Sequence, residues 1–362
     1  MAFRTEPTYT HGQPPKTAIL YCNLGTPDAP TASALRRYLA EFLGDSRVVE
    51  IPKPIWWLIL HGIILRVRPA KSAAKYASIW TAQGSPLLVH TRAQAEGLQQ
   101  ALSARGHHVL VRHAMRYGQP GIDAQLDALR AEGVTRVLAI PAYPQYSGTT
   151  TASVFDAFYR WSLQARQVPE FRFINRYHDD TGYIGALAAS VRAHWQARGQ
   201  GEVLVMSFHG VPERTLQLGD PYHCECMKTG RLLAQALGLA REQVRVTFQS
   251  RFGKAKWLEP YTEPTLIALA QEGVKKVDVV CPGFTGDCLE TLEEIQMEAR
   301  EAFLHAGGEA FEYIPCLNDS PAWIGALADL AERHLQGWNT AAPDAAAGEA
   351  SRARALAQGA KN

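Results

Sequence analysis

The sequence predicts an α/β fold made of two similar domains, each a parallel sheet flanked by helices. Short apolar runs that stop at Gly or Pro alternate with longer amphipathic stretches, a pattern typical of strands followed by helices. The two halves of the chain repeat a series of short motifs in the same order. Because 362 residues are many for a single core, two domains are expected.

Up to residue 198, apolar runs predict strands and helical periodicity predicts the helices between them. The first 16 residues are polar and contain proline, so we expect a disordered lead rather than a signal peptide. The predicted strands cover 17–27 (ending in a turn), 109–114, 136–141 and 171–176. The predicted helices cover 32–43, 91–105, 123–132, 154–166 and 183–198.

The rest of the chain repeats this alternation and then loses it. Strands are predicted over 203–208, 244–249, 277–280 and 311–315, and helices over 230–237, 265–272 and 321–335. The expected organisation is a first domain over 17–168, a second over 169–316, and a closing helix over 317–336 that packs back on the first domain. Residues 337–362 are rich in Ala and predict a disordered or loosely docked tail, in which residues 349–358 are at most a weak helix.

The internal repeat also assigns different tasks to the two domains. Four pairs of motifs correspond in order: 24–27 with 209–212, 84–86 with 219–221, 116–118 with 251–253, and 126–137 with 266–277. The second copy has His209 where the first has Leu24, and its acidic segment corresponds to the loop 143–151, which has no acids. We therefore expect the chemistry on the second domain and ligand binding on the first, with the cleft between them as the site.

Residues 51–67 interrupt the first domain with a dense group of large apolar side chains. Trp56 and Trp57 lie at its centre, and Lys and Arg residues flank it. One interpretation is a buried helix. The other is an apolar lip that rests on a membrane surface or admits an apolar ligand, since basic flanks with Trp and Leu suit an interface.

Composition excludes several functional classes. A net charge of +2 without a basic run gives no indication of nucleic-acid binding. No run of about 18 apolar residues occurs, so no membrane span is expected. Six scattered cysteines are typical of a protein in a reducing cytoplasm. Cys224 and Cys226 lie next to His223, but reduced cysteines at a helix start explain them better than a metal site.

The strongest candidates for chemistry follow two apolar runs that end at Gly and Pro. The first run presents His209 at the carboxyl edge of its sheet. The second opens a helix carrying Asp287, Glu290 and Glu294, whose i, i+3 and i+7 spacing predicts one helical face. Helix capping is the ordinary explanation for such acids. A histidine opposite crowded carboxylates, however, indicates proton transfer, binding of a divalent metal, or both.

These motifs, in combination and order, resemble those of ferrochelatases. The resemblance covers about residues 17–335 and includes 23–27, 143–147, 207–212, 219–222, 248–253, 257–258, 281–284 and 287–294. It implies insertion of Fe²⁺ into protoporphyrin IX to give protohaem, with release of two protons, as the last step of haem synthesis. It also implies a two-domain fold, in agreement with the repeat.

The resemblance assigns roles to particular residues. It implies that His209 and Glu290 form the metal site and that Glu294 and Asp287 belong to an acidic path beside them. Positions associated with porphyrin contacts fall on Arg68, Tyr76, Ser85, Tyr146, Trp257 and Phe284. The segment 51–67 corresponds to an apolar lip over the porphyrin mouth.

The resemblance implies no cofactor beyond the substrate Fe²⁺. No cysteine follows Cys316, so the C-terminal iron–sulfur cluster of some family members is not expected. The expected partners are protoporphyrin IX and Fe²⁺, with no nucleic acid and no obligate protein partner. We expect a cytoplasmic protein, with peripheral membrane contact through the lip as an open alternative. Rival functions are a chelatase for another tetrapyrrole, such as coproporphyrin III or a cobalt substrate, and a tetrapyrrole-binding protein without catalysis.

Overall fold

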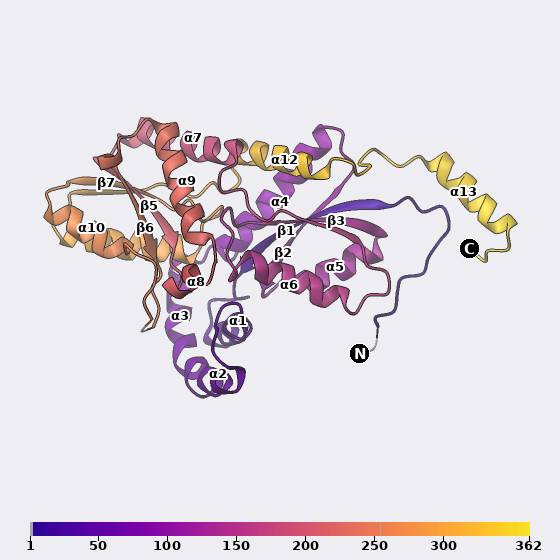
Figure 1. Ribbon diagram of the computed structural model, residues 1–362, viewed down its shortest axis with the longest axis horizontal. Helices are drawn as coiled ribbons and strands as arrows, with labels where there is room; N and C mark the ends of the chain where they lie inside the picture. The colour runs from indigo at the N-terminus through magenta and orange to yellow at the C-terminus, as the bar shows by residue number, and fades with distance from the viewer. Residues whose placement is uncertain (1–2, 254) are drawn as a thin grey trace.

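The computed structural model describes residues 3–253 and 255–362, and it contains two parallel four-stranded sheets (Figure 1). Each sheet has the same strand order, β2-β1-β3-β4 in the first and β6-β5-β7-β8 in the second. This identity of order confirms the α/β class and the internal repeat. The strands are β1 (Lys16–Gly25), β2 (Leu110–Tyr117), β3 (Val134–Pro141), β4 (Glu170–Phe173), β5 (Val203–His209), β6 (Val244–Gln249), β7 (Lys276–Val280) and β8 (Ala310–Tyr313).

Helices cover both faces of the sheets, as parallel sheets require. In the first half they are α1 (Ala32–Leu43), α2 (Lys53–Ile59), η1 (Leu60–Ile64), α3 (Leu65–Ile79), α4 (Pro86–Ala104), α5 (Ile122–Ala131), α6 (Thr151–Ser162) and α7 (Thr181–Arg198). In the second they are α8 (Glu213–Gln217), α9 (Tyr222–Leu237), η2 (Arg241–Gln243), α10 (Thr262–Gln271), η3 (Glu290–Ala299), α11 (Arg300–His305), α12 (Pro321–Leu335) and α13 (Ala345–Ala357).

One hydrophobic core is shared by the two sheets. Strand alternation sends Ile19 and Tyr21 of β1 into this core, while Ala18 and Leu20 pack on the opposite face. In β5, Met206 enters the same shared core, together with side chains of α4, α7, α9 and α12. The sheets are therefore held as one body, and the carboxyl ends of β1 and β5 stay in a fixed relation.

The predicted boundary at residue 169 is wrong. Glu170–Phe173 pairs with β3 in the first sheet, with Val137 opposite Phe171, so the first domain includes this strand. The chain passes to the second half through α7, which packs against α9 and α12. Helix α12 also packs against α4, which belongs to the first half. The boundary was misplaced because an apolar run alone does not identify the sheet that it joins.

The predicted disordered lead is also wrong for the residues described there. Arg4 forms an ion pair with Asp127 of α5. Glu6 lies 3.4 Å from Arg130 and accepts hydrogen bonds from the amides of residues 166 and 167. Periodicity does not reveal this docking, because charged contacts rather than apolar ones hold the segment.

The tail, predicted as disordered or loosely docked over 337–362, contains α13. Asp344 caps this helix by accepting a hydrogen bond from the amide of Ala347. Gly12 of the lead and Gly348 of the helix approach so closely that a Cβ on Gly12 would lie 2.3 Å from the Gly348 carbonyl. The segment around Gly12 therefore lies against α13 beside the first sheet (Figure 1).

The apolar segment 51–67 forms α2, η1 and the start of α3, and α2 projects away from both sheets (Figure 1). The interpretation as a buried helix fails, because most of its large side chains face solvent. Those exposed are Ile51, Ile55, Trp57, Leu58, Ile63 and Val67. Within 3–253 and 255–362, no helix has the length and apolarity needed to cross a membrane.

Candidate active site

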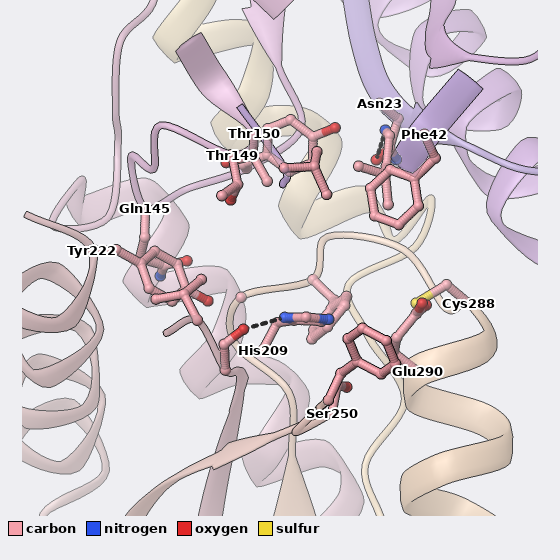
Figure 2. Close-up of a pocket in the computed structure, with 18 of the residues that line it drawn as sticks. Asn23, Phe42, Gln145, Thr149, Thr150, His209, Tyr222, Ser250, Cys288 and Glu290 are labelled. Atoms are coloured by element: carbon pink, nitrogen blue, oxygen red, sulfur yellow. Dashed lines mark hydrogen bonds between the residues drawn. The ribbon is translucent and has the colours of Figure 1, made fainter. Parts of the chain in front are cut away.

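A cavity of about 330 Å³ lies between the two halves, where the carboxyl ends of β1, β3 and β5 meet. Its walls combine apolar and aromatic side chains with a few polar groups (Figure 2). The polar lining includes Asn23, Arg68, Gln145, Thr149, Thr150, His209, Ser250, Thr285 and Glu290. The apolar lining includes Phe42, Leu43, Val48, Val49, Phe252, Trp257 and Phe284.

His209 is the last residue of β5, and its ring enters this cavity. Nδ1 lies 2.6 Å from the carbonyl oxygen of Gly210, which can only accept a hydrogen bond. In the neutral imidazole Nδ1 therefore carries the proton, and Nε2 keeps its lone pair. Figure 2 shows this second nitrogen on the side of the cavity where Glu290 lies.

Aromatic rings surround the histidine. The ring centroids of Trp257 and Phe284 each lie 6.4 Å from that of His209. At the mouth, the Arg68 guanidinium stacks on the ring of Phe252 at 4.4 Å. Burial lowers the pKa of Arg68. These flat apolar walls suit a flat ligand better than a compact polar one.

Glu290 begins η3, a π-helix, and lines the cavity beside Cys288. The Gln249 side chain donates to the Glu290 backbone carbonyl at 2.6 Å and thereby ties the start of η3 to the end of β6. Burial, followed by the nearby Glu290 carboxylate, raises the pKa of the Cys288 thiol well above its usual value. Cys288 is thus a neutral thiol beside the acid.

The predicted single face of Asp287, Glu290 and Glu294 does not form. The segment from Glu290 is a π-helix, which turns more slowly than an α-helix, and Asp287 precedes it. Asp287 is 6% exposed, and its carboxylate accepts hydrogen bonds from Asn318 at 2.7 Å and from the Tyr313 hydroxyl. This carboxylate therefore binds the segment after β8 and does not line the cavity.

Glu294 does not line the cavity itself but binds Ser250, which does. Its carboxylate accepts hydrogen bonds from the Ser250 amide at 2.6 Å and the Ser250 hydroxyl at 2.5 Å. Burial raises the pKa of Glu294, while the hydrogen bonds from Ser250 oppose that rise. A carboxyl with a raised pKa can hold a proton nearer neutral pH than an exposed one.

The predicted ligand contacts fall into three places. Arg68, Trp257 and Phe284 line the main cavity. Tyr76 and Ser85 line an adjoining pocket with room for about one water molecule, which also reaches Glu290. Burial, followed by the charge of Glu290, raises the pKa of Tyr76 well above its usual value. Tyr146 is outside both pockets; its ring lies under Arg176, 5.4 Å from the guanidinium.

The sequence reasoning missed polar residues of the walls. Ser250 follows β6 in a left-handed conformation, φ 64°, which places its amide and hydroxyl together on Glu294. Gln145, rather than Tyr146, lines the cavity. The repeat contained a signal for Ser250, because it placed 251–253 opposite 116–118 at the end of the corresponding strand.

Comparison with known proteins agrees with this geometry. The ferrochelatase family model matches residues 16–335. A ferrochelatase of Polaromonas sp. strain JS666 is 70% identical, covering 99% of this chain and 100% of the relative. A ferrochelatase of Methylibium petroleiphilum is 66% identical, with full coverage of both chains. 

A solved structure described as SirB from Bacillus subtilis with Fe³⁺ has a TM-score of 0.52 and 14% identity, covering 88% of this chain and 95% of SirB. That likeness supports the fold, whereas the matches in sequence extend over the His209 and Glu290 segments as well. The chain belongs to the ferrochelatase family.

Proposed function

We propose that this protein inserts Fe²⁺ into protoporphyrin IX and releases two protons, giving protohaem as the last step of haem synthesis. The observation that carries the proposal is the cavity with His209 and Glu290 on its walls. A porphyrin is a flat apolar disc with two propionates at one edge. The aromatic walls suit the disc, and Arg68 at the mouth suits an anionic group.

His209 supplies the first step of the proposed reaction. Metalation requires removal of the two pyrrole N–H protons, and each proton needs an acceptor. Because Nδ1 donates to Gly210, Nε2 has a free lone pair that can accept a pyrrole proton or bind the incoming Fe²⁺. The Gly210 carbonyl also fixes the ring, so the lone pair keeps its direction during turnover.

The carboxylates supply a second acceptor. Glu290 lines the cavity and can bind Fe²⁺ or take a proton, and Glu294 lies one helical turn further along η3. The raised pKa of Glu294 favours a relay in which Glu294 receives a pyrrole proton that residues of the cavity wall have taken from the porphyrin. Asp287 was predicted to join this path; its hydrogen bonds to Asn318 and Tyr313 favour a supporting role.

The test is anaerobic incubation with protoporphyrin IX and Fe²⁺, or Zn²⁺ as a surrogate, followed through the porphyrin spectrum. His209→Ala and Glu290→Gln are each expected to lower turnover by about 10²- to 10⁴-fold. Glu298→Gln is the control, because this acid is half exposed on the same helix and pairs with Lys75. Tight porphyrin binding without metalation by the wild type would support the binding-protein alternative.

Substrate choice is tested in the same assay. The exposed aromatic and aliphatic lip favours protoporphyrin IX over the more polar coproporphyrin III. Turnover of coproporphyrin III faster than protoporphyrin IX, or of Co²⁺ with no Fe²⁺ activity, would move the assignment to another chelatase. An iron–sulfur absorption band in the purified protein would contradict the expected absence of a cluster.

We further propose that the lip contacts a membrane surface from the cytoplasmic side. Trp57 and Leu58 are 59% and 65% exposed at the tip, and Lys53 and Arg66 flank them on the surface. Apolar side chains between basic residues suit the headgroup region of an anionic bilayer. Such contact would bring an apolar substrate to the mouth without passage through water.

A further inference from the structure

One wall of the cavity is a loop of the first half that the second half holds in place. The loop covers 142–150, between β3 and α6, and we call it the wall loop. Ala142, Tyr143, Gln145, Thr149 and Thr150 all line the cavity from it. The backbone amides of residues 146 and 148 in this loop donate hydrogen bonds to side chains of the second half.

Asp220 holds the tip of the wall loop. Its Oδ2 accepts hydrogen bonds from the Gly148 amide at 2.7 Å and from the Ser147 hydroxyl at 3.1 Å. Its Oδ1 accepts from the Tyr222 amide at 3.0 Å, in the first turn of α9. The fit is close, since a Cβ on Gly148 would lie 3.3 Å from Oδ2. One carboxylate thus joins the loop to the start of α9.

Glu225 holds the middle of the same loop. It is 4% exposed, and its Oε2 accepts a hydrogen bond from the Tyr146 amide at 2.7 Å. Arg176 pairs with its other oxygen, and His178 Nδ1 lies 3.4 Å from Oε2. A buried carboxylate is tolerated only with such partners. The backbone amide of a cavity wall is one of them.

Gln145 adds a third connection. Its side chain, which is 1% exposed, donates to the Thr229 hydroxyl of α9 at 3.0 Å. Thr229 in turn donates to the His178 carbonyl at 2.8 Å. The wall loop is thus tied to Asp220, just before α9, and to two turns of α9 through Glu225 and Thr229.

We propose that Asp220 and Glu225 are positioning residues that set the separation between the wall loop and His209. The inference rests on the proposed function, because it concerns how the porphyrin is held. Asp220 lies eleven residues after His209, and Tyr222 beside it lines the same cavity. The second half therefore carries the histidine and, through these carboxylates, also places the opposite wall.

The expected defect is in porphyrin binding rather than in the chemical step. Without Asp220 the wall loop loses two hydrogen bonds to a charged acceptor and can move away from the disc. His209 and Glu290 keep their own contacts, because neither touches the wall loop through a hydrogen bond that the described residues show. A change in uniform binding raises KM and leaves kcat unchanged.

The test compares Asp220→Ala, Asp220→Asn and Gly148→Ala with the wild type. For Asp220→Ala we expect KM for protoporphyrin IX to rise about tenfold and kcat to stay within about twofold. Asp220→Asn keeps one oxygen for the Gly148 amide but turns its NH2 toward the Tyr222 amide, so it should restore part of the affinity. Gly148→Ala places a methyl group against the Asp220 carboxylate without removing its charge, so it should also raise KM. This variant keeps the test valid even if Asp220→Ala folds poorly.

Hydrogen exchange of the peptide covering 142–150 is the second readout, and it should quicken in Asp220→Ala. Asp179→Ala is the matched control. This exposed acid pairs with Lys228 of α9 and makes no contact with the wall loop. We expect it to change neither KM nor exchange. Unchanged KM in Asp220→Ala, or equal defects in Asp220→Asn and Asp220→Ala, would overturn the inference.

Different outcomes refute the proposed function and the positioning role of Asp220. A wild type that binds porphyrin without metalating it refutes the function. In that case the variants can still be compared by their porphyrin affinity, which is measured from the quenching of porphyrin fluorescence. An Asp220→Ala protein that binds protoporphyrin IX as tightly as the wild type overturns the positioning role whether or not metalation occurs.

Discussion

Ser250 binds Glu294 twice, through its backbone amide at 2.6 Å and its hydroxyl at 2.5 Å. The left-handed backbone at Ser250 directs both donors at one carboxylate. Burial raises the pKa of Glu294, and these hydrogen bonds to its charged form lower it again. A residue outside the acidic segment thus adjusts the proton affinity of an acid behind the cavity.

Ser250→Ala should move the pH dependence of turnover. Loss of the hydroxyl raises the pKa of Glu294 further, so the acid stays protonated to a higher pH. If ionised Glu294 accepts the proton, activity falls as pH falls through its pKa, and this acidic limb moves to higher pH in the variant. A profile of kcat against pH measures the shift. Ser78→Ala, at an exposed serine of α3, is the control, and coincident profiles for both variants would contradict the relay.

Asp287→Ala should lower stability more than it alters chemistry. The substitution leaves Asn318 and Tyr313 without their acceptor in a buried place, at a cost of about 3 kcal/mol. Urea unfolding measures this cost. Asp319→Ala, at an exposed neighbouring acid, should cost much less. A variant with normal stability and a large loss of kcat would instead restore Asp287 to the catalytic path.

The strands and the histidine could be predicted from sequence because local residues determine both. An apolar run ending at Gly-Val-Pro places His209 at the end of β5 whatever surrounds it. The repeat matched the end of β1 with the end of β5, and the two strands occupy the same position in their sheets. These inferences needed no knowledge of distant contacts.

The acidic segment could not be predicted in the same way. The spacing of Asp287, Glu290 and Glu294 fits an α-helical face, but residue spacing does not distinguish an α-helix from a π-helix. Contacts from Gln249 and Ser250 of another strand end fix this segment. Which side of the wall loop faces the cavity likewise depends on Asp220 and Glu225, far along the chain.

Asp278→Asn should stabilise the protein at neutral pH. Asp278 lies fully buried in β7, where Oδ2 accepts hydrogen bonds from Trp195 and Gly201. Its Oδ1 has no partner among residues 3–253 and 255–362. Burial raises the pKa of Asp278 above 3.8, and the hydrogen bonds from Gly201 and Trp195 offset this only in part. Asn keeps the accepting oxygen and removes the buried charge.

The sign of the pH effect follows from the raised pKa. The protonated carboxyl is favoured in the folded state, so its stabilising effect is complete below pH 3.8 and is lost as pH rises through the raised value. At neutral pH we expect Asp278→Asn to be more stable than the wild type by about 1 kcal/mol, a gap that closes on acidification. Urea unfolding at several pH values measures it, with exposed Asp123→Asn as control. A gap independent of pH would show that charge is not its cause.

The two tryptophans of the lip should separate membrane binding from folding. Trp57 is 59% exposed, whereas Trp56 donates from Nε1 to the Leu43 carbonyl at 2.6 Å and packs on the α1 side of the core. Trp57→Ala should weaken binding to anionic liposomes about tenfold without changing Tm, since it removes apolar area only from the bilayer contact. Trp56→Ala should instead cost about 2 kcal/mol of folding stability. Liposome co-sedimentation and thermal unfolding measure the two effects, and equal liposome binding by wild type and Trp57→Ala would contradict a membrane role for the lip.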